Sequence, residues 1–270
     1  MSEPTTPPTR SHGRKSIRAS MTPRDLITPT PQLAGAWAVQ VITLVPQAFP
    51  GVLGESLTGR ALTDGLWTLD AIDLRRFGEG KHRNVDDTPA GGGAGMVLRA
   101  DVMGAAIEAA QRNAPAGAPL IYLSPRGARF DQAMAREWAA APGLTLICGR
   151  FEGLDQRAID HYGAIEVSLG DFVMTGGDIA AQAMIDAALR LRPRILGNAA
   201  STTDESHSDG LLEHPQYTRP AEWQGHPIPP ILMSGNHGEI AKWRQAQAEQ
   251  LTQDRRPDLW QAWQDRKGRP

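Results

Sequence analysis

The sequence predicts an α/β fold: a mostly parallel sheet with helices on both faces, followed by a small, mainly helical second domain. Two observations lead to this prediction. Apolar runs of strand length alternate with stretches whose apolar residues recur at helical spacing. Strand followed by helix, several times over, is typical of a parallel sheet that helices cover. With 270 residues, the chain is long enough to bury a core without disulfide or metal support.

The N-terminal segment, residues 1–36, differs from the rest in composition. It is rich in Pro, Ser, Thr and Arg and shows no hydrophobic periodicity. Such a segment cannot bury enough apolar surface to offset the entropy of ordering, so we predict a disordered extension. Its basic residues could help to attract RNA, and the alternative is a dispensable tail.

The next part, residues 37–196, contains the alternating pattern. The strand candidates are "VQVITLV" (39–45), "PLIYLSP" (119–125), "LTLICGR" (144–150) and "AIEVSLG" (164–170). The helix candidates are residues 100–114, 130–141 and 178–192, and Pro193 ends the last of them because proline cannot continue a helix. We expect this part to be one α/β domain.

The polar stretch 197–210 is predicted to be an interdomain linker, and residues 211–270 a second domain. Prolines in "HPQYTRPAEW" and "HPIPPIL" favour extended loops, whereas 238–253 and 257–266 have helical patterns.

Charge and cysteine content narrow the functional classes. The net charge of -2 indicates no global attraction to nucleic acid or membrane, so an anionic partner would need a local basic patch. The single cysteine, Cys148, excludes an internal disulfide and suits a reducing compartment. Its apolar neighbours favour a buried, inert thiol over a nucleophile. There is no apolar run of membrane-spanning length and no secretory signal, so we expect a cytoplasmic protein.

Glycine-bearing segments follow three of the predicted strands, where open α/β sheets bind ligands: "YLSPRG", "CGRFEG" and "SLGDFVMTGGD". None matches a dinucleotide fingerprint or a P-loop. A fourth loop, "DDTPAGGGAGM", is either a phosphate cradle or a mobile turn, and an α/β enzyme that uses it for phosphate stays an alternative. The histidine spacing does not favour a metal site, and no G-x-S-x-G elbow indicates a serine hydrolase.

Eight motifs, taken in order, resemble the bacterial tRNA (guanine-N1) methyltransferase family, TrmD. They are "TLVPQAF", "TGRAL", "VDDTPAGGGAGM", "IYLSPRG", "CGRFEGLDQR", "SLGDFVMTGGD", "LLEHPQYTRP" and "ILMSGNHGEIAKWR", and the resemblance runs from about Trp37 to Trp260. It implies the SPOUT fold with a deep trefoil knot around Tyr122 to Asp178. It also implies S-adenosylmethionine, bent, among three loops. The implied binding residues are Tyr122, Leu123, Ser124, Pro125, Gly149, Arg150, Glu152, Leu169, Gly170, Asp171, Phe172, Val173, Met174, Gly176 and Gly177.

The reaction that the resemblance implies is methyl transfer to N1 of guanosine 37 in tRNA. Neutral guanine carries a proton on N1, so a base must remove it while a cation stabilises the charge that moves to O6. The family's arginine falls on Arg190, with Arg192 a weaker candidate. Its aspartate base falls on Glu205, and Asp204 has the matching side chain one position earlier. This departure leaves a catalytically impaired RNA-binding protein of the same fold as the alternative function.

The resemblance further implies a homodimer, in which the linker and C-terminal domain of one subunit complete the pocket of the other. It also implies tRNA as the partner, bound through a flipped-out guanine and phosphate contacts. The candidate phosphate contacts are Arg60, His82, Arg83, Arg219, Lys242 and Arg244.

Overall fold

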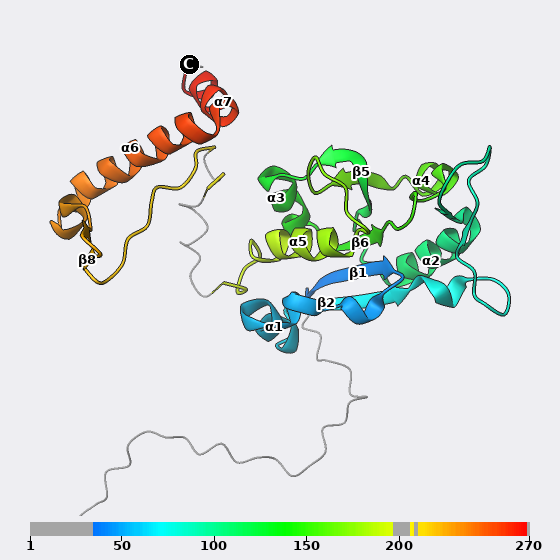
Figure 1. Ribbon diagram of the computed structural model, residues 1–270. Coiled ribbons are helices and arrows are strands. Elements are labelled where there is room, and N and C mark those ends of the chain that lie inside the picture. The colour runs from blue at the N-terminus through cyan, green and yellow to red at the C-terminus, as the bar shows by residue number, and fades with distance from the viewer. Residues whose placement is uncertain (1–34, 197–205, 208–209, 269–270) are drawn as a thin grey trace, which may run out of the picture. The chain divides into compact units, whose positions relative to one another are not determined.

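The computed structural model describes residues 35–196, 206–207 and 210–268. Residues 37–168 contain a five-stranded sheet in the order β2-β1-β6-β5-β7, in which every neighbouring pair is parallel (Figure 1). Its strands are β1 (Trp37–Thr43), β2 (Trp67–Asp73), β5 (Leu120–Arg129), β6 (Gly143–Cys148) and β7 (Ile165–Ser168). The predicted mostly parallel sheet is therefore confirmed.

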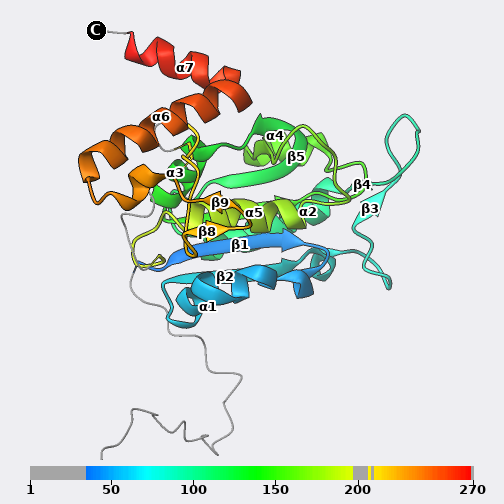
Figure 2. The same ribbon diagram turned by 60° about the vertical axis from the view of Figure 1, so that its left-hand side comes forward.

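Helices cover both faces of this sheet, because alternate strand residues pack into two separate hydrophobic clusters. On β5, Ile121 and Leu123 pack with residues of α1, α3 and α5, whereas Leu120 and Tyr122 pack with residues of α2 and α4 (Figure 2). The helices are α1 (Ser56–Thr63), α2 (Ala100–Asn113), α3 (Gln132–Ala140), α4 (Gln156–Tyr162) and α5 (Asp178–Leu189). This two-sided burial explains why the central strands have apolar runs instead of strict alternation.

Two predicted boundaries differ from the structure. Strand β5 continues to Arg129, well past Pro125, because a shift in register between Leu123 and Ala128 lets it pair again with β7. Helix α5 ends at Leu189 and not at residue 192, with Arg190 as its C-cap residue. Pro193 disfavours helical backbone in the residue before it, so the helix stops earlier than its apolar pattern does.

Three elements of the sheet and its covering helices were not predicted, namely α1, α4 and β2. The sequence of β2, "WTLDAID", includes two aspartates, and most of its residues are only half-buried. It lies at the edge of the sheet, where only one neighbouring strand pairs with it. The apolar signal of such an edge strand is weak, which explains the omission.

The glycine-rich loop "DDTPAGGGAGM" lies on a short antiparallel ribbon, β3 (Asp86–Asp87) with β4 (Val97–Leu98). Figure 2 shows this ribbon projecting from the sheet. Its base is tied to the segment after β6, because Glu152 N donates to Met96 O at 2.9 Å and Leu98 N donates to Gly153 O at 2.8 Å. The loop is thereby placed next to the carboxyl end of β6.

The C-terminal segment, residues 210–268, is mainly helical, as predicted. Its elements are β8 (Glu222–Trp223), β9 (His226–Pro227), a 3-10 helix η5 (Pro230–Met233), α6 (His237–Arg255) and α7 (Pro257–Lys267). The Asn236 side chain caps α6 by accepting from Glu239 N at 3.3 Å. Thr252 Oγ1 accepts from Leu212 N at 2.8 Å, which fastens the start of the segment to α6.

Several predictions fall outside the described residues. They include nearly all of the predicted extension 1–36 and most of the predicted linker 197–210. The domain boundaries and the trefoil knot stay predictions. Among the described residues, no helix is both long and apolar enough to cross a membrane.

Candidate functional site

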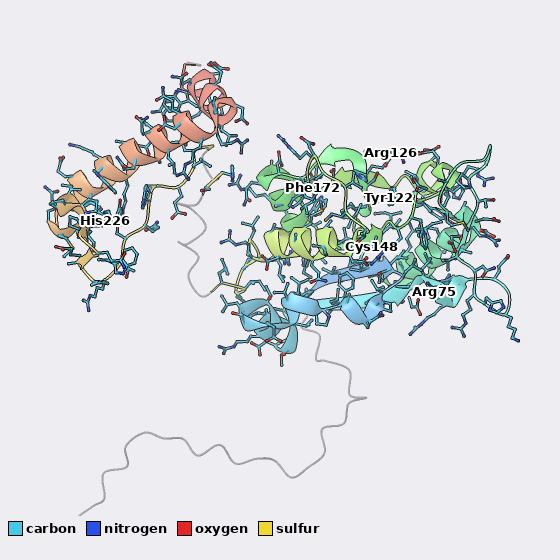
Figure 3. The ribbon with its side chains drawn as sticks, viewed as in Figure 1. Arg75, Tyr122, Arg126, Cys148, Phe172 and His226 are labelled. Atoms are coloured by element: carbon cyan, nitrogen blue, oxygen red, sulfur yellow. The ribbon has the colours of Figure 1, made fainter. Side chains whose placement is uncertain are left out.

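A cavity of about 280 Å³ lies at the carboxyl ends of β5, β6 and β7. Figure 3 shows Tyr122, Arg126 and Phe172 in this region of the fold. Thirteen of the fifteen predicted donor-binding residues line the cavity: Tyr122, Leu123, Ser124, Pro125, Gly149, Arg150, Glu152, Leu169, Phe172, Val173, Met174, Gly176 and Gly177. The fold therefore brings three segments that are distant in sequence to one place.

Gly170 and Asp171 are the two exceptions, since neither lines the cavity. The carboxylate of Asp171 is 89% exposed and lies 3.9 Å from the guanidinium of Arg129. The turn at residues 170–171 therefore contributes nothing to the cavity lining, whereas its neighbours Leu169, Phe172 and Val173 do.

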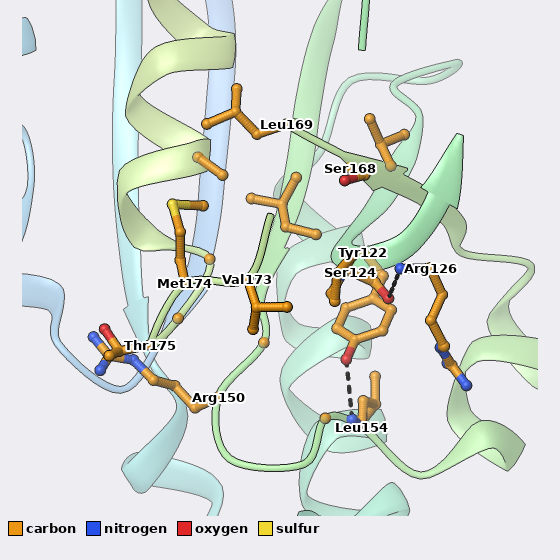
Figure 4. Close-up of a pocket in the computed structure, with 18 of the residues that line it drawn as sticks. Tyr122, Ser124, Arg126, Arg150, Leu154, Ser168, Leu169, Val173, Met174 and Thr175 are labelled. Carbon is orange, nitrogen blue, oxygen red and sulfur yellow. Dashed lines mark hydrogen bonds between the residues drawn. The ribbon is translucent and has the colours of Figure 1, made fainter. Parts of the chain in front are cut away.

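The first wall of the cavity comes from β5 and is held by the Tyr122 side chain. The Tyr122 hydroxyl accepts a hydrogen bond from Leu154 N at 3.1 Å, and the Ser124 hydroxyl accepts from Arg126 N at 3.2 Å (Figure 4). Burial is the main reason why the pKa of Tyr122 is raised above its ordinary value. A neutral phenol therefore holds the turn after β6 in place.

The second wall is formed by two glycine-containing loops whose backbones pack closely against each other. A Cβ added at Gly149 would lie 3.0 Å from Tyr122 Cε2, and one at Gly177 would lie 3.0 Å from Cys148 Cα. Gly177 N also donates to Gly149 O at 2.9 Å. Glycine fits here without strain, because a Cβ at either position would make a tighter contact than most Cβ atoms do.

The third wall is apolar and partly open. Phe151, Phe172 and Val173 line the cavity and are 53%, 55% and 82% exposed. Large apolar side chains that stay this exposed at a cavity commonly mark a binding surface. They supply faces against which a flat, apolar ring can pack.

The rim carries charge of both signs. Arg126 lies 3.1 Å from Glu166, and Arg150 lies 2.7 Å from the carboxylate of Asp178. Beneath the cavity, Cys148 is only 2% exposed, and burial raises the pKa of its thiol well above the ordinary value. The prediction of a buried thiol is confirmed, and the raised pKa opposes a role as a nucleophile.

Of the predicted catalytic residues, the structure describes Arg190 and Arg192. Glu205 and Asp204 are outside the described residues. Arg190 is half-buried at the C-terminal end of α5, whereas the cavity lies at the N-terminal end of that helix. At 1.5 Å per residue, the two ends of α5 are roughly 18 Å apart. Arg190 therefore does not line the donor cavity of its own chain.

Eight residues that line the cavity were not predicted: Arg126, Phe151, Gly153, Leu154, Val167, Ser168, Thr175 and Ala180. Arg126, Phe151 and Thr175 lie inside the glycine-bearing segments themselves, so the strand-end rule could have found them. Ala180 carries no such signal, because it is one of many small apolar residues in α5.

A second cavity, of about 1130 Å³, lies within the C-terminal segment between residues 214 and 244. Tyr217 and Trp243 form its aromatic part, with ring centroids 6.2 Å apart. Arg219 and Arg244 also line it, and no aspartate or glutamate does among the residues that the structure describes. Its lining is therefore largely apolar, with an aromatic pair and two arginines.

The other candidate phosphate contacts lie outside this second cavity. Lys242 pairs with Glu239 at 2.9 Å, and Arg60 lies 3.7 Å from Asp64. His82 and Arg83 are exposed in the turn before β3. Among the described residues, no group of three or more His, Cys, Asp or Glu side chains is placed to hold a metal ion.

Comparison with known proteins identifies the family. The family described as "tRNA (Guanine-1)-methyltransferase TrmD" matches residues 37–262. A Ruegeria pomeroyi protein named tRNA (guanine-N(1)-)-methyltransferase is 68% identical over 238 residues, covering 88% of this chain and 98% of the relative. A Nitrobacter winogradskyi protein of the same name is 58% identical over 226 residues, covering 84% and 94%. This chain therefore belongs to the TrmD family of tRNA (guanine-1)-methyltransferases.

Proposed function

We propose that this chain transfers the methyl group of S-adenosylmethionine to N1 of guanosine 37 in tRNA. The observation that carries the proposal is the strand-end cavity, which three loops line and where the loops at Gly149 and Gly177 pack closely against each other. Its volume of about 280 Å³ suits a compact ligand, since ligand pockets commonly start at about 300 Å³. A bent methyl donor in this cavity would also explain why the sequence lacks a dinucleotide fingerprint.

The donor would be held by two kinds of contact. Backbone N–H and C=O groups of the cavity-lining loops around Gly149 and Gly177 can read the polar edge of an adenine, because no Cβ intervenes at the glycines. The apolar side chains of Phe172 and Val173 can cover a ring face. Both kinds of contact are present before the ligand arrives, so little ordering is needed on binding.

The chemical step needs a base for the N1 proton and a cation near O6. We assign the base to Glu205, with Asp204 as its rival, because glutamate at the family's position is chemically adequate. We assign the cation to Arg190. Hydrogen-bond donors that point at a developing oxyanion, in a site without bulk water, often make the largest single contribution to lowering the activation barrier.

The active unit is proposed to be a homodimer, in which one subunit completes the cavity of the other. The position of Arg190 supports this proposal, since roughly 18 Å of helix separates it from its own donor cavity. From that position, Arg190 would contact a guanine bound at the cavity of a different subunit. A second copy of the chain would provide that cavity.

For tRNA, we propose the C-terminal segment as a main contact. The second cavity combines aromatic faces, on which an unstacked base can pack, with Arg219 and Arg244 for phosphate. The cytoplasm, where tRNA and the donor are both present, is the proposed location.

The direct test is transfer of labelled methyl from S-adenosylmethionine to a tRNA transcript with guanosine at position 37, followed by mapping of the product. We expect 1-methylguanosine at that position, and no product from a matched transcript with adenosine 37. If S-adenosylhomocysteine binds but no methyl is transferred, the catalytically impaired RNA-binding protein is the better assignment. Absence of S-adenosylhomocysteine binding would refute the methyltransferase function and favour an α/β enzyme that uses the glycine-rich loop for phosphate.

The base assignment is tested by two matched substitutions, Glu205→Gln and Asp204→Asn. We expect the first alone to lower the single-turnover rate, by about 100-fold or more, because general-base catalysis typically contributes 10²–10⁴-fold. A loss of rate confined to Asp204→Asn would assign the base to Asp204. If both variants keep the parent's rate, neither residue is the base.

A further inference from the structure

Asp178, the first residue of α5, is a carboxylate that is nearly inaccessible to water. It is 5% exposed, and both of its oxygens accept hydrogen bonds. Oδ2 accepts from Arg150 Nε at 3.0 Å and from Arg150 Nη2 at 2.7 Å, while Oδ1 accepts from the Thr43 hydroxyl. A buried carboxylate is stable only when it is paired and hydrogen-bonded in this way.

These contacts join three segments that are far apart in sequence. Thr43 ends β1, Arg150 follows β6, and Asp178 begins α5. Thr43 is itself held, because its hydroxyl accepts from Val45 N at 3.0 Å. The carboxylate is therefore the point at which the end of β1 is tied to two of the donor-cavity loops.

Arg150 is the member of this network that reaches the cavity. It lines the cavity and forms a backbone bridge with Gly176. Its guanidinium lies against that glycine, since a Cβ added at Gly176 would lie 2.4 Å from Arg150 Nε (Figure 4). The position of the guanidinium and the spacing of the two loops therefore depend on each other.

A carboxylate in the first turn of a helix also interacts favourably with the helix dipole. That interaction does not require burial or a guanidinium partner, because an exposed aspartate would provide it. The charge-assisted bonds from Arg150 and the bond from Thr43 need a separate explanation.

We propose that Asp178 and Thr43 are positioning residues for methyl-donor binding, which act by fixing Arg150 against Gly176 and so holding the two cavity loops at their binding distance. The proposal rests on the proposed function, because it assumes that the cavity holds the donor. Neither residue lines the cavity, so their effect passes through Arg150.

The first test is Asp178→Asn, which keeps the shape and removes the charge. We expect the dissociation constant of S-adenosylhomocysteine and the KM for S-adenosylmethionine to rise about 10-fold or more, because bonds to charged groups are among the stronger ones. We expect kcat at saturating donor to change less than about 3-fold, since binding of the donor is weakened equally in the ground state and the transition state. Asp160→Asn, an exposed carboxylate on α4, is the matched control and should change neither.

The second test asks whether Asp178 acts through Arg150. Donor affinity is measured for Asp178→Asn, Arg150→Gln and the double variant. If the carboxylate works only by placing the guanidinium, the double variant binds no more weakly than Arg150→Gln alone. If the double variant instead loses affinity by the product of the two single losses, Asp178 does not act through Arg150.

A milder pair keeps the test informative if Asp178→Asn does not fold. Thr43→Val removes one hydrogen bond to the carboxylate, and Thr43→Ser keeps it. We expect a roughly 3- to 10-fold loss of donor affinity for valine and near-parent affinity for serine. A lower melting temperature with unchanged donor affinity, for either Thr43→Val or Asp178→Asn, would show a structural role only. If the parent itself fails to bind the donor, the proposed function fails instead.

Discussion

The two cavities differ in what holds their walls. The strand-end cavity is bounded by backbone that is locked between buried strands and helices, with glycines where loops touch. The cavity of the C-terminal segment is lined by apolar residues together with aromatic rings and two arginines. The first is suited to recognise one small ligand by shape, and the second a flexible polyanion by charge and stacking.

This contrast has an energetic consequence. Steric fit between packed backbones is insensitive to salt, and small changes in volume are costly there. Binding of exposed arginines to phosphate releases counterions, so it weakens as the salt concentration rises. Ligand binding at the strand-end cavity should therefore be sensitive to changes in packing, and binding at the second cavity should be sensitive to salt concentration.

The largest effect is expected when a methyl group is added near the strand-end cavity, and the same change in the C-terminal segment serves as its control. A Cβ at Gly127 would lie 2.3 Å from Val167 N and 2.3 Å from Glu166 C, so β5 and β7 would have to separate. We expect Gly127→Ala to lower the free energy of unfolding by about 1–3 kcal/mol and to weaken S-adenosylhomocysteine binding at least 10-fold. Denaturant unfolding and calorimetry measure the two quantities.

The matched substitution in the C-terminal segment is Gly238→Ala. The nearest atom to its added Cβ would be Asn236 Oδ1 at 3.5 Å, which is an ordinary contact. We expect unfolding to change by less than about 1 kcal/mol, because alanine is also the better helix former. Equal losses for the two variants would show that the donor cavity is no more tightly packed than α6.

A smaller effect is expected for Arg244→Gln, which removes one cation from the second cavity. We expect a roughly 3- to 10-fold weaker affinity for tRNA, a slope of log affinity against log salt that is smaller by about one, and unchanged donor affinity. Arg255→Gln, at the other end of the same helix and outside the cavity, is the control. If both variants keep the parent's salt slope, the second cavity does not bind phosphate.

The smallest effect concerns the thiol beneath the first cavity. Burial raises the pKa of Cys148 in the folded protein, so the neutral thiol is favoured there. The resulting stabilisation is complete below the pKa of the unfolded thiol, about 8.5, and is lost progressively as the pH rises above it. We expect the unfolding free energy of the parent to fall more steeply than that of Cys148→Ala above pH 8.5, by up to about 1.4 kcal/mol per pH unit. Parallel curves would contradict this expectation.

Much of the α/β part could be predicted because its central strands and covering helices have strong apolar periodicity. The strand-end glycine segments indicated which loops carry the site, since parallel strands end at one edge of the sheet. The thirteen correctly predicted lining residues came from the resemblance to the family's motifs. The edge strand β2 and the short helices α1 and α4 escaped prediction, as their sequences bury too little to stand out. The turn at Gly170 and Asp171 could not be placed from sequence, because its direction depends on the backbone path after β7.

The sequence by itself determined the fold class, the family motifs and the loops that carry the candidate site, because these follow from local patterns and residue types. Only the tertiary structure showed that Asp178 pairs with Arg150 and Thr43, which are 28 and 135 residues away along the chain. It also placed Arg190 at the far end of α5 from the cavity. The physical reason is that such contacts depend on how distant strands and helices pack together, and no periodicity within one segment records that.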